Sequence, residues 1–170
     1  MKRLVLFLIA FSLFLCANAQ IRDTFYGCKL GVTTKKQLLD NLKELGYKYM
    51  YDNENKCYYV ENVMFVGKQW DSCQFYFYKD TLSYVGFGLQ SDKEEVIDVY
   101  NQNIENARTK YDKIEGKMSR DDPNSKQCYF DDGVIVLSIG YNIEENNYAS
   151  LIYQSKKLIN QMDEDAYDDI

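Results

Sequence analysis

The residues that could perform catalysis in this chain are mainly carboxylates, because the sequence contains no histidine. Without histidine there is no Ser-His or Cys-His pair to activate a nucleophile, and no Ser-x-x-Lys motif stands at a predicted strand-to-helix turn. Two carboxylates could still hydrolyse a glycosidic bond. The acidic residues on predicted strands or turns are Glu61, Asp71, Asp80, Asp131 and Asp132. Acidic residues at turns are usually only solvated, so we expect a protein without catalytic activity.

Metal and cofactor sites are not predicted either. The oxygen-rich segments at 52–55 and 121–122 do not have the spacing of an EF-hand loop, and we expect solvated turns there. A zinc site would need four thiolates from widely separated positions, since no CxxC motif is present. The segment Gly86-Phe87-Gly88 lies inside a predicted strand, where glycine marks a close backbone approach rather than a nucleotide-binding loop.

The first nineteen residues resemble a secretory signal peptide. Lys2 and Arg3 precede an apolar run over 4–15, and the segment ends in Ala17-Asn18-Ala19. The run is shorter than the roughly 20 residues of a membrane-spanning helix, and no later segment is apolar enough to span. Lipid attachment at Cys16 is disfavoured because Leu15, rather than a small residue, precedes it. We therefore expect a secreted or periplasmic protein that begins near Gln20.

The expected export of the chain suggests that its remaining cysteines form disulfides. The mature chain would keep an even number of them, Cys28, Cys57, Cys73 and Cys128, and exported chains commonly form disulfides. We expect two bridges. Alternation aligns Cys73 with the core-facing Phe75 and Phe77, which favours its pairing with Cys28 at the entry of the first helix, although three connectivities are possible.

The charge of the mature chain excludes one class of partner. Removal of the signal segment leaves 18 basic residues against 26 acidic ones, a net charge of −8. An acidic chain without a basic run gains nothing from phosphate attraction, so we expect no nucleic-acid binding. The end of the chain, 161–170, is predicted to be a disordered acidic tail.

The pattern of residues 20–160 predicts one α+β domain. Its first part, about 33–90, opens with a helix marked by Thr34 and Gln37 in capping-box spacing and closed by Gly46. Four strands rich in aromatic and β-branched residues follow, over 47–51, 57–66, 70–78 and 82–89. Their short connections require antiparallel neighbours.

The second part, about 91–155, repeats the order of helix and strands. Ser91 and Glu94 mark the start of a helix whose apolar stripe is Ile97, Tyr100, Ile104, Ala107, Tyr111 and Ile114. After Gly116, the segment 117–126 is predicted to be a surface loop, and three strands follow over 127–131, 134–141 and 148–154. We expect one antiparallel sheet with helices packed on one face.

A family resemblance agrees with this outline. The entry Gly27-Cys28-Lys29-Leu30-Gly31-Val32-Thr33-Thr34, the leucine-rich helix and the aromatic meander resemble β-lactamase-inhibitor-protein-like folds. The closing segments 133–139 and 148–153 resemble small secreted proteins of unknown function from Gram-negative gut bacteria. The resemblance implies that the exposed concave face of the sheet grips a partner.

The aromatic residues suggest which surface does so. Tyrosine hydroxyls prefer contact with water, so we assign Phe75 and Phe77 to the core and predict a partner-binding aromatic face on the open side of the sheet. Its predicted members are Tyr47, Tyr49, Tyr51, Trp70, Tyr76 and Tyr78. The function expected from this face is non-catalytic binding of an envelope or extracellular protein, with inhibition of that protein as one form of it. The alternative is binding or carboxylate-based processing of a carbohydrate, since exposed rings also stack on sugars.

Overall fold

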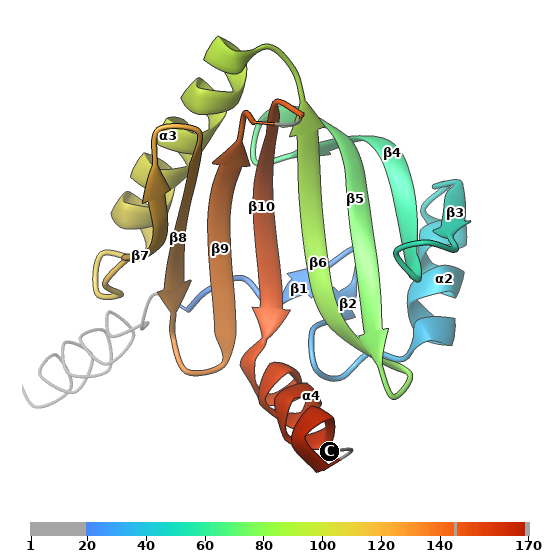
Figure 1. Cartoon of the computed structure of the whole chain (residues 1–170). Helices are drawn as coiled ribbons and strands as arrows, with labels where there is room; N and C mark the ends of the chain where they lie inside the picture. Colours follow the sequence, from blue (N-terminus) through green and yellow to red (C-terminus); the bar gives the residue numbers. More distant parts are fainter. Residues whose placement is uncertain (1–19, 145, 169–170) are drawn as a thin grey trace, which may run out of the picture.

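One large antiparallel sheet dominates the computed structural model, which describes residues 20–144 and 146–168. The predicted signal peptide lies outside the described residues. In spatial order, the strands are β3 (Tyr49–Asp52), β4 (Cys57–Phe65), β5 (Lys68–Tyr78), β6 (Thr81–Gln90), β10 (Tyr148–Ser155), β9 (Ile135–Asn142), β8 (Ser125–Asp131) and β7 (Lys117–Asp122) (Figure 1). A two-stranded hairpin, β1 (Thr24–Phe25) and β2 (Cys28–Lys29), accompanies it.

Three helices complete the described fold: α2 (Lys35–Glu44), α3 (Lys93–Lys110) and α4 (Lys156–Asp168). The protein is therefore an α+β protein with a large antiparallel sheet. Along the chain, α2 precedes the meander β3 to β6, and α3 precedes the meander β7 to β10. The last strands of the two meanders, β6 and β10, pair at the centre of the sheet. None of the helices in the described residues is both long and apolar enough to cross a membrane.

The local signals for helix starts hold in the structure. Thr34 caps α2, and its side chain and that of Gln37 form the predicted reciprocal capping box. Helix α3 begins one residue later than predicted, because Asp92 caps it and accepts a hydrogen bond from the backbone of Glu95. Ser91 instead donates a side-chain hydrogen bond to the Glu95 carboxylate.

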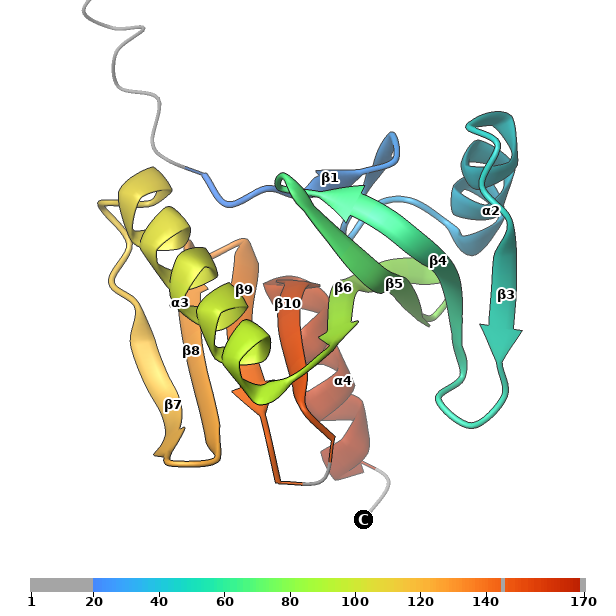
Figure 2. The ribbon, with the colours of Figure 1, turned by 90° about the horizontal axis from the view of Figure 1, so that it is seen from above.

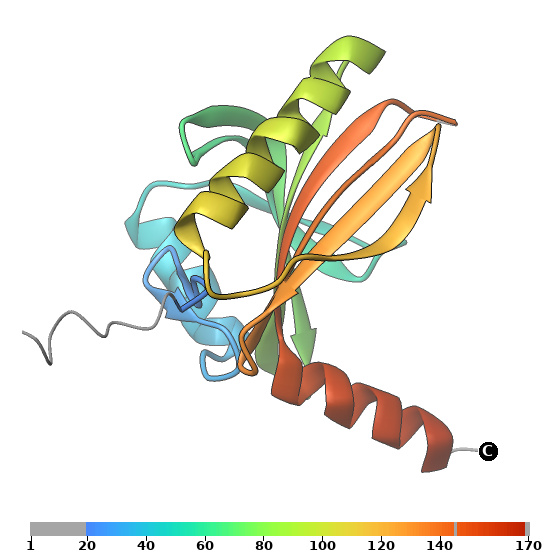
Figure 3. The ribbon, with the colours of Figure 1, turned by 90° about the vertical axis from the view of Figure 1, so that its left-hand side faces the viewer.

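The core lies between α3 and the sheet (Figure 3). The buried side of α3 comprises Val96, Val99, Tyr100, Ile104, Ala107 and then Tyr111, so the predicted stripe is shifted only at its start, where Val96 and Val99 are buried and Ile97 is partly buried. Phe75 is fully buried and Phe77 packs against the core, as predicted. Helix α4 differs from α3, because it projects from the end of β10 toward the opposite side of the sheet (Figure 3). The expectation that all helices share one face is wrong for α4.

Two segments differ from their predicted structure. The predicted loop 117–126 contains β7, an edge strand whose side chains are nearly all exposed. An edge strand exposed on both faces lacks the alternation that identifies a strand in a sequence. The predicted tail overlaps α4, whose Leu158 is buried and whose Asp165 pairs with Lys79. These contacts with the rest of the molecule are not visible in a local sequence pattern.

The predicted disulfides are not present, since the four cysteines are free and buried thiols. The sheet separates two of them, Cys57 and Cys128, from Cys73. Cys73 faces the core, whereas Cys57 precedes Tyr58, the strand partner of Phe75, and so faces the other side of the sheet. Cys128 lies on β8, four strands from β5, a separation of about 19 Å at ordinary strand spacing. The Cys28 sulfur accepts a hydrogen bond from the Asn41 amide at 3.3 Å.

Candidate binding surface

The face of the sheet opposite α3, here called the open face, carries no charge at its centre. Strand register places twelve residues of the four central strands on this face: Ser72, Gln74, Tyr76, Tyr84, Gly86, Gly88, Val136, Ser138, Gly140, Ser150, Ile152 and Gln154. None of them is ionisable as an acid or base near neutral pH, although 27% of the chain is charged. A sheet face that only contacts water does not require this composition. The centre of the open face is thus chemically distinct from the rest of the surface.

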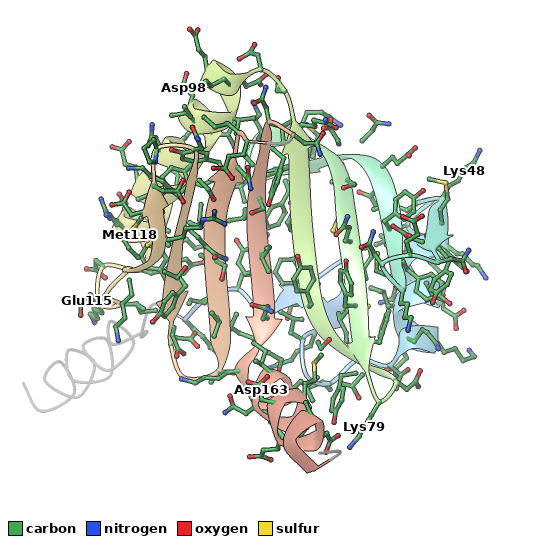
Figure 4. All side chains as sticks on the ribbon, in the orientation of Figure 1. Lys48, Lys79, Asp98, Glu115, Met118 and Asp163 are labelled. Atoms are coloured by element: carbon green, nitrogen blue, oxygen red, sulfur yellow. The ribbon has the colours of Figure 1, made fainter. Side chains whose placement is uncertain are left out.

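The small residues on this face create a hollow of about 370 Å³. We call it the sheet hollow. Its lining residues are Gln74, Tyr84, Gly86, Phe87, Gly88, Arg120, Ser125, Lys126, Gln127, Gly140, Tyr141, Asn142, Tyr148, Ser150 and Ile152. Figure 2 shows the sheet bent into an arch whose edge strands β3 and β7 curl to the same side. In Figure 4, which looks onto the open face, the labelled charged residues all lie at the perimeter, away from the central strands: Lys48, Lys79, Asp98, Glu115 and Asp163.

Three glycines line the hollow, and their surroundings differ. A Cβ atom on Gly86 would lie 2.5 Å from the Tyr84 ring, so this ring occupies the space above Gly86. A Cβ atom on Gly140 would lie 3.1 Å from the backbone oxygen of Lys126. At Gly88 the nearest atom would be the Ser72 hydroxyl at 3.5 Å, an ordinary contact. Glycine in a strand costs about 0.5–1 kcal/mol relative to alanine, so Gly88 lowers stability at a position where packing does not require it.

Two tyrosines contribute hydroxyls to the hollow from opposite ends. The Tyr84 ring packs edge-on against Tyr76 with centroids 4.7 Å apart. Burial raises the pKa of Tyr84, and the nearby Tyr76 and Tyr148 contribute in the same direction. Burial also raises the pKa of Tyr76 to about 12. Tyr148 is 44% exposed at the other end. The phenols of Tyr84 and Tyr76 therefore stay protonated at physiological pH and can donate hydrogen bonds.

The cations at the rim of the hollow are neutralised by neighbouring carboxylates. Arg120 donates to Asp122 at 2.8 Å, and Lys126 pairs with Asp121 at 2.9 Å. The hydrogen bond from Arg120 lowers the pKa of Asp122, so this partner is ionised at neutral pH. The polar groups deeper in the hollow are amides and hydroxyls. The arrangement suits a polar ligand without a strong charge.

Helix α4 partly covers the end of the open face. The Tyr78 hydroxyl donates to the Asp165 carboxylate, which also pairs with Lys79 at 2.6 Å. A second cavity of about 220 Å³ lies between helix and sheet, lined by Tyr76, Ser83, Tyr84, Gln154, Ile159 and Met162. Tyr76 and Tyr84 line this cavity from the sheet, and Ile159 and Met162 line it from α4, so α4 lies next to the open face.

The predicted aromatic face is divided between the two sides of the sheet. Tyr76 and Tyr78 lie on the open side, as expected, but the register of β3 aligns Tyr49 with Val60 and Cys73 on the core side. Tyr51 is likewise aligned with Tyr58 and Phe75. These rings form an edge cluster beside α2. Its ring contacts are Tyr26 with Tyr47, Tyr49 with Tyr58, and Tyr51 with Tyr58.

Trp70, a predicted member of the aromatic face, is instead buried in the core. Its side chain has 0% exposure, and its indole N–H donates to the carbonyl of Phe65 at 3.1 Å. The twist of the β4–β5 ribbon near Asn62, a residue with positive φ, carries Trp70 to the core side along with Cys73, three positions away. Simple alternation along β5 therefore gave the wrong side for this residue.

Four of the five carboxylates considered for catalysis contact other residues of the chain, whereas the fifth, Glu61, is exposed. Asp71 accepts a hydrogen bond from the Gln90 backbone at 2.7 Å. Asp131 pairs with Lys156, and Asp132 accepts from the backbone of Val134 and Ile135. Further contacts of this kind are those of Asp80 with Lys35 and of Asp52 with Asn55. Within the described residues, no group of three or more metal-ligating side chains is brought together.

Sequence reasoning missed Tyr84 and Tyr148, two of the aromatic residues that line the hollow. A signal for the hollow was nevertheless present. Glycine or serine occupies alternate positions of two strands, as Gly86 and Gly88 in one and as Ser138 and Gly140 in the other, and Ser150 lies in a third strand. The close backbone approach predicted for Gly86-Phe87-Gly88 is not found, because the group close to Gly86 is the Tyr84 side chain and the nearest group to Gly88 is the Ser72 hydroxyl at an ordinary distance.

Comparisons of the chain with protein-family models, curated proteins and solved structures found no match. The geometry of the open face is therefore the basis for a functional conclusion.

Proposed function

We propose that this protein is an exported, non-catalytic binding module whose open sheet face receives its partner. The observation that carries the proposal is the uncharged centre of this face, where small residues form the sheet hollow in a highly charged chain. Glycine in a central strand often marks a site where another molecule approaches closely. The signal-like segment at 1–19 supports export.

The arrangement of elements supports the same proposal. We infer a β-lactamase-inhibitor-protein-like fold from the order of one helix and a four-stranded meander, which occurs twice, and from the curvature of the sheet (Figure 2). In that family the concave sheet face grips the partner. The corresponding face here is the open face, and the partner we expect is a molecule of the cell envelope or the extracellular space.

Site-specific photo-crosslinking tests the proposal. A photoreactive phenylalanine derivative replaces Tyr148 on the open face or, as a control of similar exposure, Tyr51 on the other side. In the producing cells, adducts should form from position 148 and not from position 51. Gly88→Arg, which places a charge in the hollow, should abolish the adduct. Thr24→Arg, an exposed position on β1, should leave it unchanged.

Adducts that form from position 51 alone, or that persist in Gly88→Arg, would show that the partner binds elsewhere. Circular dichroism of each variant separates a loss of binding from a loss of folding.

A further inference from the structure

We infer that the sheet hollow binds a neutral sugar ring, an inference that rests on the proposed function of the open face and names its ligand. The first argument is size. The hollow has a volume of about 370 Å³, near the lower end of the range for small-ligand pockets. It opens on the solvent side of the sheet, so it can admit one terminal or branching ring of a larger glycan.

The second argument is the type of polar group. Gln74, Gln127 and Asn142 present amides, and Ser150, Tyr84 and Tyr148 present hydroxyls. Each of these groups can both donate and accept hydrogen bonds, as sugar hydroxyls do. The side chains of Gln74, Tyr84 and Ser150 form no hydrogen bond with other described residues, so their capacity is available to a ligand.

The third argument is charge. An anionic ligand would need unpaired cations, but Arg120 and Lys126 are each paired with an aspartate. A cationic ligand would need carboxylates, and none lines the hollow. The hollow therefore favours a polar ligand without net charge.

The fourth argument is the presence of aromatic rings beside these polar groups. The C–H groups on one face of a sugar ring are apolar and pack well on an aromatic face. Tyr148 has the exposed area for this contact, and Tyr84 lies over the glycine floor with its hydroxyl in the hollow. Together, the rings can contact the apolar C–H face of a sugar, and the amides can bind its hydroxyl groups.

The test is a titration of the folded protein, monitored by NMR, with glucose, galactose, mannose and N-acetylglucosamine, and with glucuronate as the charged comparison. At least one neutral sugar should shift the backbone amide signals of Gly86, Gly88, Gly140 and Ser150. Tyr148→Ala should weaken that binding by about tenfold. Tyr51→Ala should leave it unchanged.

Gly88→Val provides the decisive variant. Valine is a good strand residue, and its Cβ atom would make only an ordinary contact with Ser72, so the fold should persist while the hollow is filled. Sugar binding should be lost. Gly88→Ala serves as the milder substitution should valine disturb the sheet.

Three results would overturn the inference: no amide shift with any neutral sugar, shifts that persist in Gly88→Val, or stronger binding of glucuronate than of glucose. If sugars fail while position 148 still crosslinks to a protein, the open face remains the binding surface and only the ligand class is wrong. If neither sugar binding nor crosslinking from position 148 is observed, the proposed function itself is contradicted.

Discussion

Trp70 shows how one side chain can stabilise the centre of the first meander. It is fully buried, its ring lies 6.0 Å from that of Phe87, and Phe87 stacks on Phe65 at 3.9 Å. Its indole N–H is satisfied by the Phe65 carbonyl. The residue therefore combines a large buried area with a completed hydrogen bond, which is the condition under which tryptophan is stable in a core.

Replacing Trp70 by alanine should destabilise the protein by about 3–5 kcal/mol, because it creates a large cavity and leaves a carbonyl without its donor. Urea denaturation measures this change. Tyr51→Ala, at a position that is 48% exposed, is the control and should change the free energy of unfolding by less than about 1 kcal/mol. Equal effects of the two substitutions would show that Trp70 is not part of the core.

Buried tyrosines make the protein sensitive to alkaline pH. Burial raises the pKa of Tyr84, Tyr153 and Tyr26, and raises that of Tyr76 to about 12. Because the folded pKa values exceed the unfolded value of about 10, the unfolded chain loses protons first as pH rises, and stability falls above pH 10. The urea midpoint should decrease between pH 10 and 12. A constant midpoint over this range would contradict the burial of these phenols.

At the scale of secondary structure, elements with one buried side were predictable and exposed elements were not. Alternation and capping signals located α2, α3 and most strands, because burial of one face imposes a regular pattern on the sequence. The edge strand β7 has no buried face, and α4 depends on contacts with distant residues such as Lys79 and Asp131. Contacts between residues so far apart in the sequence can be identified only from the tertiary structure.

Helix α4 should respond to the loss of its contact with the β5–β6 turn. Asp165→Asn weakens the ion pair with Lys79 and the hydrogen bond from Tyr78. Hydrogen exchange over 161–168 should become faster, while the global free energy of unfolding changes by less than about 1 kcal/mol, since the pair is solvent-exposed. Asp163→Asn removes the same charge from the same helix and should not alter exchange. Equal acceleration in both variants would indicate an effect of helix charge alone.

The candidate site was less predictable than the fold, because it depends on which side of the sheet each residue faces. Tyr47, Tyr49 and Tyr51 have the alternation expected of an open face, but cross-strand register aligns them with core residues. A shift of one residue in register reverses every side chain of a strand. The composition of the open face became visible only when four strands from distant parts of the chain were aligned.

At the scale of the whole molecule, the distribution of the cysteines is the main departure from expectation. An even number of cysteines favours disulfides in exported proteins, yet these four thiols are all free and buried. Burial raises the pKa of each of them, most strongly that of Cys73, and a thiol that stays protonated reacts slowly.

Alkylation followed by mass spectrometry tests this arrangement. The native protein should react slowly with iodoacetamide. Without any reductant, the mature chain unfolded in denaturant should gain four carbamidomethyl groups, because all four thiols are free. A chain that gains fewer groups until a reductant is added contains a disulfide, and the assignment of four free thiols would then be wrong.

The pairing of β6 with β10 also determines when the sheet hollow can form during biosynthesis. Partners across this junction, such as Gln90 and Tyr148, are far apart in sequence, whereas the meanders are built from neighbouring strands. Contacts between distant segments form late because they close a long loop. Gly86 and Gly88 come from the first meander, and Gly140 and Ser150 from the second. A nascent chain that has not yet reached residue 148 therefore has only half of the sheet hollow and leaves the edge of β6 unpaired, so a chaperone that covers β6 would shield this edge until β10 is made.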